Sequence, residues 1–276
     1  MYSSPKPTLK EVKDTNKRLA KQLTVASRLI VDYIKSEDRQ MVIEKADSLT
    51  KSERQSSQLA GIILLKKIAT ESPYDADNLT RFANFVDPHR NEDMKYHLML
   101  AFAEAVKTMA DGDFIDKDIK DRKISSIMES DMHDTLKTYS ISPLLRRCAA
   151  VRALGILRTS IFYPSVRELT YHDPYDPNSN EPNLALVDAA AAAICDANIE
   201  GAFEELHNAY TYTMDRKDIT QVTTESITSI ILKTIHTRLA LSIEVNEKER
   251  VEVFNFLLDT RYFNNRMGSG GAYPSP

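Results

Sequence analysis

Two alanine-rich stretches near the middle of the chain constrain its fold more than any other feature. The first spans residues 143–157, where Ser142 can cap the helix and Pro143 suits its first position, and the second spans 183–195. Both have the length of a helix, and a helix face made of small side chains lets a neighbouring backbone approach closely. Each is followed by a predicted helix with larger apolar side chains, which are Val166 and Leu169 in the first case and Phe203, Leu206 and Tyr210 in the second. The sequence therefore predicts two successive helix-turn-helix units between residues 142 and 212.

Helical pairs of this kind cannot bury their apolar faces alone, and stacking several pairs completes the burial. The pattern over residues 142–212 resembles the HEAT-type α-solenoid. In the second unit the residues at the family's core positions are Leu186, Ala189, Ala190, Ala191, Ala193, Ile194, Phe203 and Leu206. The first unit departs from the family at Leu145, which lies one residue early, and lacks the usual Asp before its second helix; its matching residues are Cys148, Ala149, Ala150, Ala153, Leu154 and Gly155. An irregular all-α domain with two alanine-rich core helices is the alternative.

Apolar spacing predicts further helices on both sides of the central units. The predicted segments are 9–34, 41–49, 52–70, one that begins at Asp75 or Asp77 and ends at residue 87, 91–110, a charged helix within 111–130, 223–241 and a last helix after residue 246. Only seven glycines occur in the chain, which argues against a sheet-rich fold. We therefore expect an all-α protein, an irregular HEAT-like stack of helical hairpins with a long N-terminal helix and about ten to twelve helices in total.

Residues 9–34 carry the longest regular apolar pattern in the chain. Alternating steps of three and four residues place one seam along the predicted helix, formed by Leu9, Val12, Asn16, Leu19, Leu23, Ala26, Ile30 and Tyr33. Such a seam is typical of coiled coils, where a buried Asn fixes the register. Because Ala26 and Tyr33 suit a coiled-coil dimer poorly, the sequence favours a first helix that packs on its own chain. A homodimer through residues 9–34 is the alternative.

The net charge of −4 is unevenly distributed along the chain. Residues 1–35 hold eight Lys/Arg and three Asp/Glu, a balance of +5, so the remainder holds 28 against 37, a balance of −9. A basic segment on an acidic body is a candidate for partner binding, although a solvated helix face has the same pattern. The acidic body and the absence of Trp argue against nucleic acid as the partner. The candidate partner-binding residues are Lys10, Lys13, Lys17, Arg18, Lys21, Arg147 and Arg158.

Metal-ligand patterns in the sequence are incomplete. Glu204 and His207 have the spacing of one di-iron ligand pair, but no other His has a Glu three residues before it to supply the second pair. Residues 176–180 begin like a calcium-binding loop, yet Glu181 replaces the required Gly and Val187 replaces the required Glu. We therefore expect neither a metal nor another cofactor.

The two cysteines do not form a pattern typical of catalysis. Cys148 and Cys195 lie among alanines, where a thiol is ordinarily an unreactive part of the core. The chain contains no nucleotide-binding loop and no serine-hydrolase motif, so we expect no enzymatic activity. It also has no apolar run of the length that a membrane span needs and no signal sequence, which predicts a cytoplasmic location.

The predicted organisation has three parts, which are a basic helical segment at 1–50, a helical-repeat domain at 51–262 and a flexible tail at 263–276. Repeat stacks present extended surfaces, so the predicted function is a non-enzymatic scaffold or adaptor that binds another protein or a peptide. Two alternatives remain open. One is a homodimeric structural protein, and the other is a nucleic-acid-binding or processing protein with a site built across repeats.

Overall fold

The computed structural model describes residues 6–71, 91–111, 144–157, 170, 181–196, 201–240 and 247–268. Within these ranges the regular structure consists of ten helices and no strand, which confirms the predicted all-α class. The helices are α1 (Leu9–Leu29), α2 (Val31–Ile34), α3 (Arg39–Thr50), α4 (Gln55–Glu71), α6 (Glu92–Asp111), α8 (Leu144–Leu157), α10 (Leu184–Asp196), α11 (Ala202–Asp215), α12 (Gln221–Ala240) and α13 (Glu247–Gly268).

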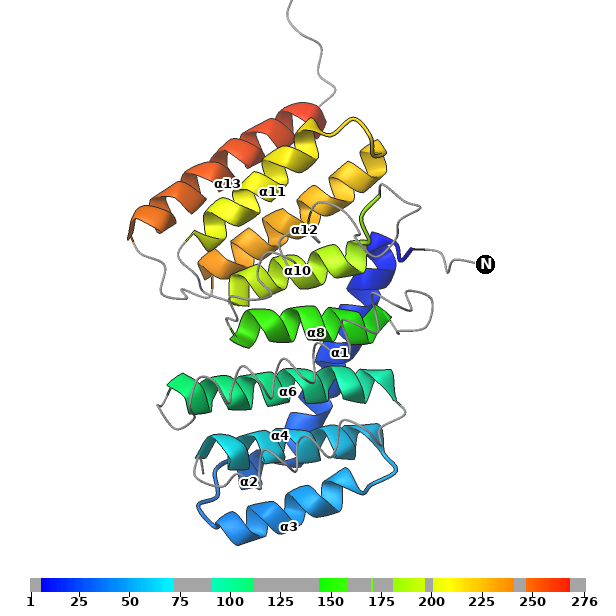
Figure 1. Ribbon diagram of the computed structural model, residues 1–276, viewed down its shortest axis with the longest axis vertical. Coiled ribbons are helices and arrows are strands. Elements are labelled where there is room, and N and C mark those ends of the chain that lie inside the picture. The colour runs from blue at the N-terminus through cyan, green and yellow to red at the C-terminus, as the bar shows by residue number, and fades with distance from the viewer. Residues whose placement is uncertain are drawn as a thin grey trace, which may run out of the picture.

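The helices form a stack along the long axis of the molecule (Figure 1). Helices α3, α4, α6, α8, α10 and α12 follow one another in this order, and each contacts the next. At the upper end of the view, α11 and α13 both pack on α12. One continuous apolar core runs through the stack, from Val42 in α3 to Val253 in α13. This arrangement confirms the predicted helical stack, while its likeness to HEAT repeats stays a prediction.

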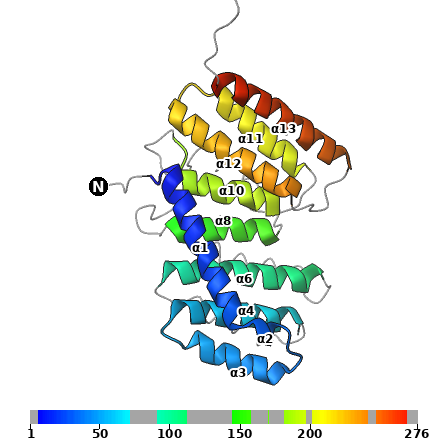
Figure 2. The same ribbon diagram turned by 180° about the vertical axis from the view of Figure 1, so that it is seen from behind.

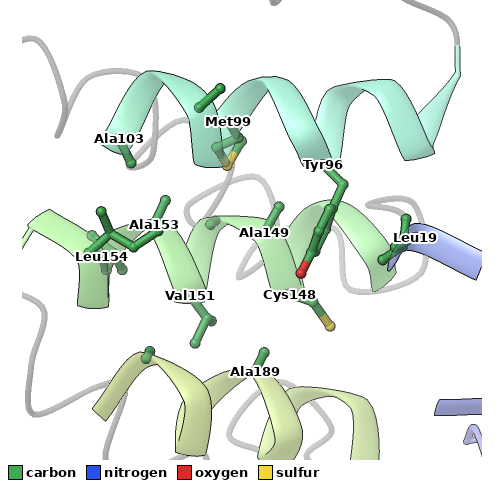
Figure 3. Packing of buried hydrophobic residues seen from close by; sticks show 14 of the residues in the cluster. Leu19, Tyr96, Met99, Ala103, Cys148, Ala149, Val151, Ala153, Leu154 and Ala189 are labelled. Carbon is green, nitrogen blue, oxygen red and sulfur yellow. The ribbon is translucent and has the colours of Figure 1, made fainter. Parts of the chain in front are cut away.

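Small side chains bring α8 and α10 into close contact. Ten of the 14 residues of α8 and eight of the 13 residues of α10 are buried, including every residue predicted as core in these two helices. Gly155 marks the closest approach, because a Cβ atom added there would lie 2.5 Å from Cα and 2.7 Å from the carbonyl carbon of Ala193. Figure 3 shows the same kind of packing on both sides of α8, with Ala149 and Ala153 directed toward α6 and Val151 directed toward α10.

Polar side chains define the beginnings of the stacked helices. Asn91 precedes α6, and its Oδ1 accepts a hydrogen bond from the backbone N–H of Asp93 at 2.9 Å. Asn183 precedes α10 in the same way and accepts from the backbone N–H of Ala185 at 3.1 Å. These contacts satisfy N–H groups that have no partner within the helix. Gly201 precedes α11 with φ of 86°, a conformation that glycine adopts without strain.

Helix α1 crosses the stacked helices instead of joining their order, as Figure 2 shows. It contacts α4 near one end and α10 near the other. The predicted seam faces the stack, and Val12, Leu19, Ala26 and Ile30 are all less than 9 % exposed. The prediction that the first helix packs on its own chain is therefore confirmed. Leu23 is the exception in this seam, because it remains 41 % exposed.

Several boundaries differ from the predicted ones. Helix α4 begins at Gln55, and Ser52 accepts a hydrogen bond from the backbone N–H of Arg54 at 3.2 Å in the turn before it, so Ser52 does not cap the helix as expected. Helix α13 continues to Gly268 and so enters the predicted tail. One core cluster includes residues on both sides of the predicted boundary at residue 50. The predicted helix that ends at residue 87, the predicted helix with Val166 and Leu169, and the segment 111–130 apart from Asp111 at the end of α6 lie outside the described residues.

Candidate functional site

Two adjoining hollows lie between the stacked helices, and α1 borders one of them. One has a volume of about 410 Å³ and is enclosed by α1, α6, α8, α10 and α12. The other has a volume of about 500 Å³ and is enclosed by α4, α6, α8 and α10. Leu100, Arg152 and Asp196 line both hollows, so together they form one groove, called here the groove beside α1.

The lining of this groove is mixed in character. Leu100 and Ile156 supply apolar surface. Lys66 and Glu104 form an ion pair at one end, where burial lowers the pKa of Lys66 below its usual value. Lys233 of α12 lies at the other end. Apolar patches edged by charged groups are typical of surfaces that bind protein segments.

Arg152 organises the centre of the groove by joining three helices. From α8, its Nη1 donates to the Tyr96 hydroxyl of α6 at 3.0 Å, and its Nη2 donates to Oδ2 of Asp196 of α10 at 3.1 Å. Burial disfavours the charge on Arg152, but Tyr96 and Asp196 outweigh this effect and raise its pKa. Burial raises the pKa of Tyr96, because it disfavours the charged phenolate. At neutral pH this cluster therefore presents a neutral phenol and a fixed ion pair, which suit recognition better than proton transfer.

On the other side of α1, a smaller cavity of about 190 Å³ lies between α1 and the beginnings of α8 and α10. Figure 3 shows Tyr96 reaching from α6 toward Cys148, with Leu19 of α1 nearby. Burial raises the pKa of the Cys148 thiol to about 12, and its Sγ donates to the carbonyl oxygen of Ala185 at 3.4 Å. The thiol therefore stays protonated at neutral pH.

Polar contacts hold α1 across α6 and α10. Asn16 Nδ2 donates to Oδ2 of Asp188 at 3.0 Å. Arg18 Nη2 and Gln22 Nε2 donate to the two carboxylate oxygens of Asp93, each at 2.9 Å. The stack residues beneath α1 are called here the bed of α1, and they are Asp93, Tyr96, His97, Leu144, Leu145, Cys148, Ala185, Asp188 and Ala189.

His97 is the most strongly perturbed histidine in this region. Its side chain lies in α6 with only 4 % of the residue exposed, and its Nε2 lies 3.3 Å from Oε1 of Gln22 in α1. Burial lowers its pKa to about 4, although Asp93 partly opposes this effect. His97 is therefore neutral at neutral pH and packs edge-on against Tyr96, with the ring centroids 5.5 Å apart.

The structure separates the predicted partner-binding residues into different environments. The four lysines of α1 among them are exposed, which agrees with their expected position off the seam; they are Lys10, Lys13, Lys17 and Lys21. Arg18 bonds to Asp93 within the chain. Arg147 is only 9 % exposed in α8, so its side chain offers little surface to a partner. Arg158 lies outside the described residues.

The remaining candidate residues lie mostly in apolar surroundings. Cys148 and Cys195 are buried, as predicted. His207 stacks on Phe203 and also contacts Phe256, with ring centroids 5.8 Å and 4.8 Å apart, respectively. Among the described residues no group of three potential ligands is placed to hold a metal ion. None of the helices in the described ranges has both the length and the apolar character that a bilayer crossing requires.

The central cluster was not predicted from the sequence, although one signal could have indicated part of it. Arg152 lies in a helix whose neighbours are small apolar residues, and a charged group in such surroundings needs a partner. That reasoning could have found Arg152. It could not have found Tyr96 or Asp196, which are 56 and 44 residues away in sequence.

Comparison with known proteins adds no relative. No protein-family model matches the chain, and neither a curated protein nor a solved structure matches it.

Proposed function

We propose that this protein is a non-enzymatic scaffold of the HEAT-like type, which binds a segment of another protein in the groove beside α1. The observation that supports this function is the continuity of the groove. Its two hollows, of about 410 and 500 Å³, share Leu100, Arg152 and Asp196 and together extend over five of the stacked helices, α4, α6, α8, α10 and α12. A peptide or a helix of a partner suits such an elongated site better than a compact small molecule does.

The partner would contact apolar and charged groups together. Leu23 is 41 % exposed and lines the hollow of about 410 Å³, so a partner would cover an apolar side chain that α1 leaves open. Arg152 and Asp196 are already paired, which fixes their donors and acceptors in position before binding. Prepositioned polar groups of this kind contribute mainly to specificity, whereas the apolar surface contributes most of the affinity.

The test compares groove variants with matched surface variants in the full chain. The double variant Leu23→Glu/Lys233→Glu changes one apolar and one basic side chain that line the groove. The control Val222→Glu/Lys248→Glu makes the same changes at residues that are strongly exposed and do not line it. Proteins captured from a native lysate would be quantified for wild type and for both variants, after circular dichroism shows equal helicity.

We expect the groove variant to capture a specific protein at least about tenfold less than wild type does. The reason is that two contacts buried against the partner are replaced by unfavourable ones. The control should capture as much as wild type. Equal capture by all three proteins would remove the groove as the binding surface. Capture of nucleic acid alone would instead favour the alternative of nucleic-acid binding.

The homodimer alternative has a direct measurement as well. Most of the seam at residues 9–34 lies against the stack of its own chain, so a dimer through this seam would require α1 to leave its place. Sedimentation equilibrium of the full chain distinguishes the two cases. A monomeric mass is the expected result, and a dimer would favour the alternative.

A further inference from the structure

Helix α1 is less deeply buried than the helices that it crosses. It buries three of its 21 residues, whereas α8 buries ten of 14. The three buried residues are Val12, Leu19 and Ala26, which lie seven residues apart on a single narrow line. A segment with few buried apolar contacts opens at a lower free energy than the core does. Helix α1 therefore has the properties of a local opening unit.

Helix α1 does not fill the space above its bed completely. A cavity of about 190 Å³ remains between α1 and the bed of α1, and the larger hollow of about 410 Å³ lies along its other side. Both spaces are lined by Leu19 and Asn16 of α1. Both spaces open to the surface, so α1 lies between two hollows and the bed is not shaped closely around it.

Hydrogen bonds to carboxylates help to hold α1 on its bed, and these negative groups complement the basic character of the helix. The bed offers the carboxylates of Asp93 and Asp188, and α1 supplies donors to them from Asn16, Arg18 and Gln22. Arg18 is 54 % exposed at its side chain, so water competes for its ion pair with Asp93. The bed therefore recognises a helix with cationic and amide donors beside an apolar line, and these contacts are individually weak enough to exchange.

A break in the helix separates α1 from the helices that follow it and provides a hinge for its opening. Helix α1 ends at Leu29 and α2 begins at Val31. Between them Ile30 has φ of −128° and ψ of 11°, which interrupts the helical geometry, while its side chain is fully buried. Ile30 thus anchors the chain at the point where the backbone is already bent, and the contact of α1 with α4 lies next to this anchor, whereas its contact with α10 lies at the far end of the helix.

We propose that the bed of α1 is a binding site for a basic amphipathic helix of a partner protein, and that α1 is its intramolecular occupant. The partner helix would carry small or apolar side chains at seven-residue intervals, with Arg, Lys or amide donors placed like those of Asn16, Arg18 and Gln22. This inference rests on the proposed scaffold function and adds a second binding site beside the groove, with the class of its partner and its control. While α1 is seated, the apparent affinity for the partner helix falls in proportion to the fraction of open molecules.

The test uses a fluorescently labelled peptide of residues 6–34 as the probe and the full chain as its receptor. In the loosened variant Arg18→Ala/Gln22→Ala, both donors to Asp93 are removed. In the matched control Lys17→Ala/Lys21→Ala, two outward-facing side chains of the same helix are removed. Fluorescence anisotropy would give the affinity of the peptide for each protein, and hydrogen exchange would report the opening of α1.

We expect the loosened variant to bind the peptide about tenfold more tightly than wild type, because its own α1 competes less well for the bed. The control should match wild type, and a peptide with Leu19→Asp should bind none of the proteins. Hydrogen exchange should become faster in α1 of the loosened variant and stay unchanged in α8. Equal peptide affinities for the loosened and control variants would overturn the proposal.

A second outcome would also overturn it in its present form. If sedimentation shows that the loosened variant dimerises by exchanging α1 between two copies, the occupant of the bed is a second copy of this chain and not a partner protein. The peptide assay contains no cellular partner. Its failure therefore argues against exchange at the bed while leaving the groove beside α1 to be judged by the capture experiment.

Discussion

The contact between α8 and α10 and the contact between α1 and its bed are built from similar residues but differ in strength. Both place small side chains at the interface, with Ala193 against Gly155 in the first and Ala185 and Ala189 of the bed in the second. In the first, the two backbones touch and most of each helix is buried. In the second, one narrow apolar line is supplemented by hydrogen bonds to Asp93 and Asp188.

This difference indicates that small residues favour a stable contact where the backbones approach closely and most of each helix is buried. Close approach multiplies dispersion contacts and leaves no room for water. Where the approach is partial, as beneath α1, cavities remain and polar side chains hold the element in place. The first contact determines the fold, and the second is suited to regulation.

The largest expected effect is at the contact between α8 and α10. Gly155→Val should lower the free energy of unfolding by more than about 4 kcal/mol, because the added side chain meets the backbone of Ala193, which cannot move aside. The half-buried Ala192 of α10 provides the control, and Ala192→Val should change stability by less than about 1 kcal/mol. Chemical denaturation followed by circular dichroism measures both. Equal stabilities would contradict the close contact.

A smaller and more local effect is expected on α1. Leu19→Ala removes a buried side chain and should cost about 3 kcal/mol, chiefly as easier opening of α1. Native-state hydrogen exchange should therefore show faster exchange in α1 and unchanged protection in α8 and α10. Leu29 is 46 % exposed, so Leu29→Ala should cost less than about 1 kcal/mol. If α8 and α10 also lose protection, α1 is not a separate unit.

Acidification should weaken the contact between α1 and its bed, through His97. The pKa of His97 is lowered from 6.5 to about 4 by burial, so the neutral form stabilises the folded protein fully above pH 6.5. That contribution is lost as the pH falls from about 6.5 to 4, which should lower stability by about 2 to 3 kcal/mol. Because His97 contacts Gln22, α1 should loosen first. His97→Gln should flatten the stability profile in this range, and an unchanged profile would contradict the assignment.

The smallest effect concerns the groove beside α1. Tyr96→Phe removes the hydroxyl that accepts from Arg152 and should cost about 1 kcal/mol, because Arg152 keeps its bond to Asp196. Thermal unfolding measures the change. The exposed Tyr212 serves as the control, since Tyr212→Phe should leave stability within about 0.5 kcal/mol of wild type. A loss of several kcal/mol would mean that Tyr96 supports the core and not the groove alone.

Local patterns in the sequence were sufficient for much of the fold. The alanines of α8 and α10 indicated buried helices because alanine both favours helix and permits close packing, and the structure confirms their burial. The seven-residue repeat of Val12, Leu19 and Ala26 indicated the inward face of α1. Such properties depend on spacing along one helix, so a single sequence is enough to show them.

The candidate site could not be predicted in the same way, because it depends on contacts between distant parts of the chain. The guanidinium group of Arg152 donates to Tyr96 on one neighbouring helix and to Asp196 on the other. No spacing rule in the sequence links these three positions. Arg147 shows the opposite problem. Its charge suggested an exposed surface, but the rotation of α8 about its axis buries it.

The position of α1 also has a consequence for how the protein is made. Asn16 and its acceptor Asp188 are 172 residues apart in the chain. At translation rates of about 5 to 20 residues per second, roughly ten to thirty seconds separate the synthesis of these two residues. During that interval α1 has left the ribosome with its apolar seam uncovered while α10 does not yet exist. The nascent chain therefore presents a basic amphipathic helix to chaperones long before its own bed can receive it.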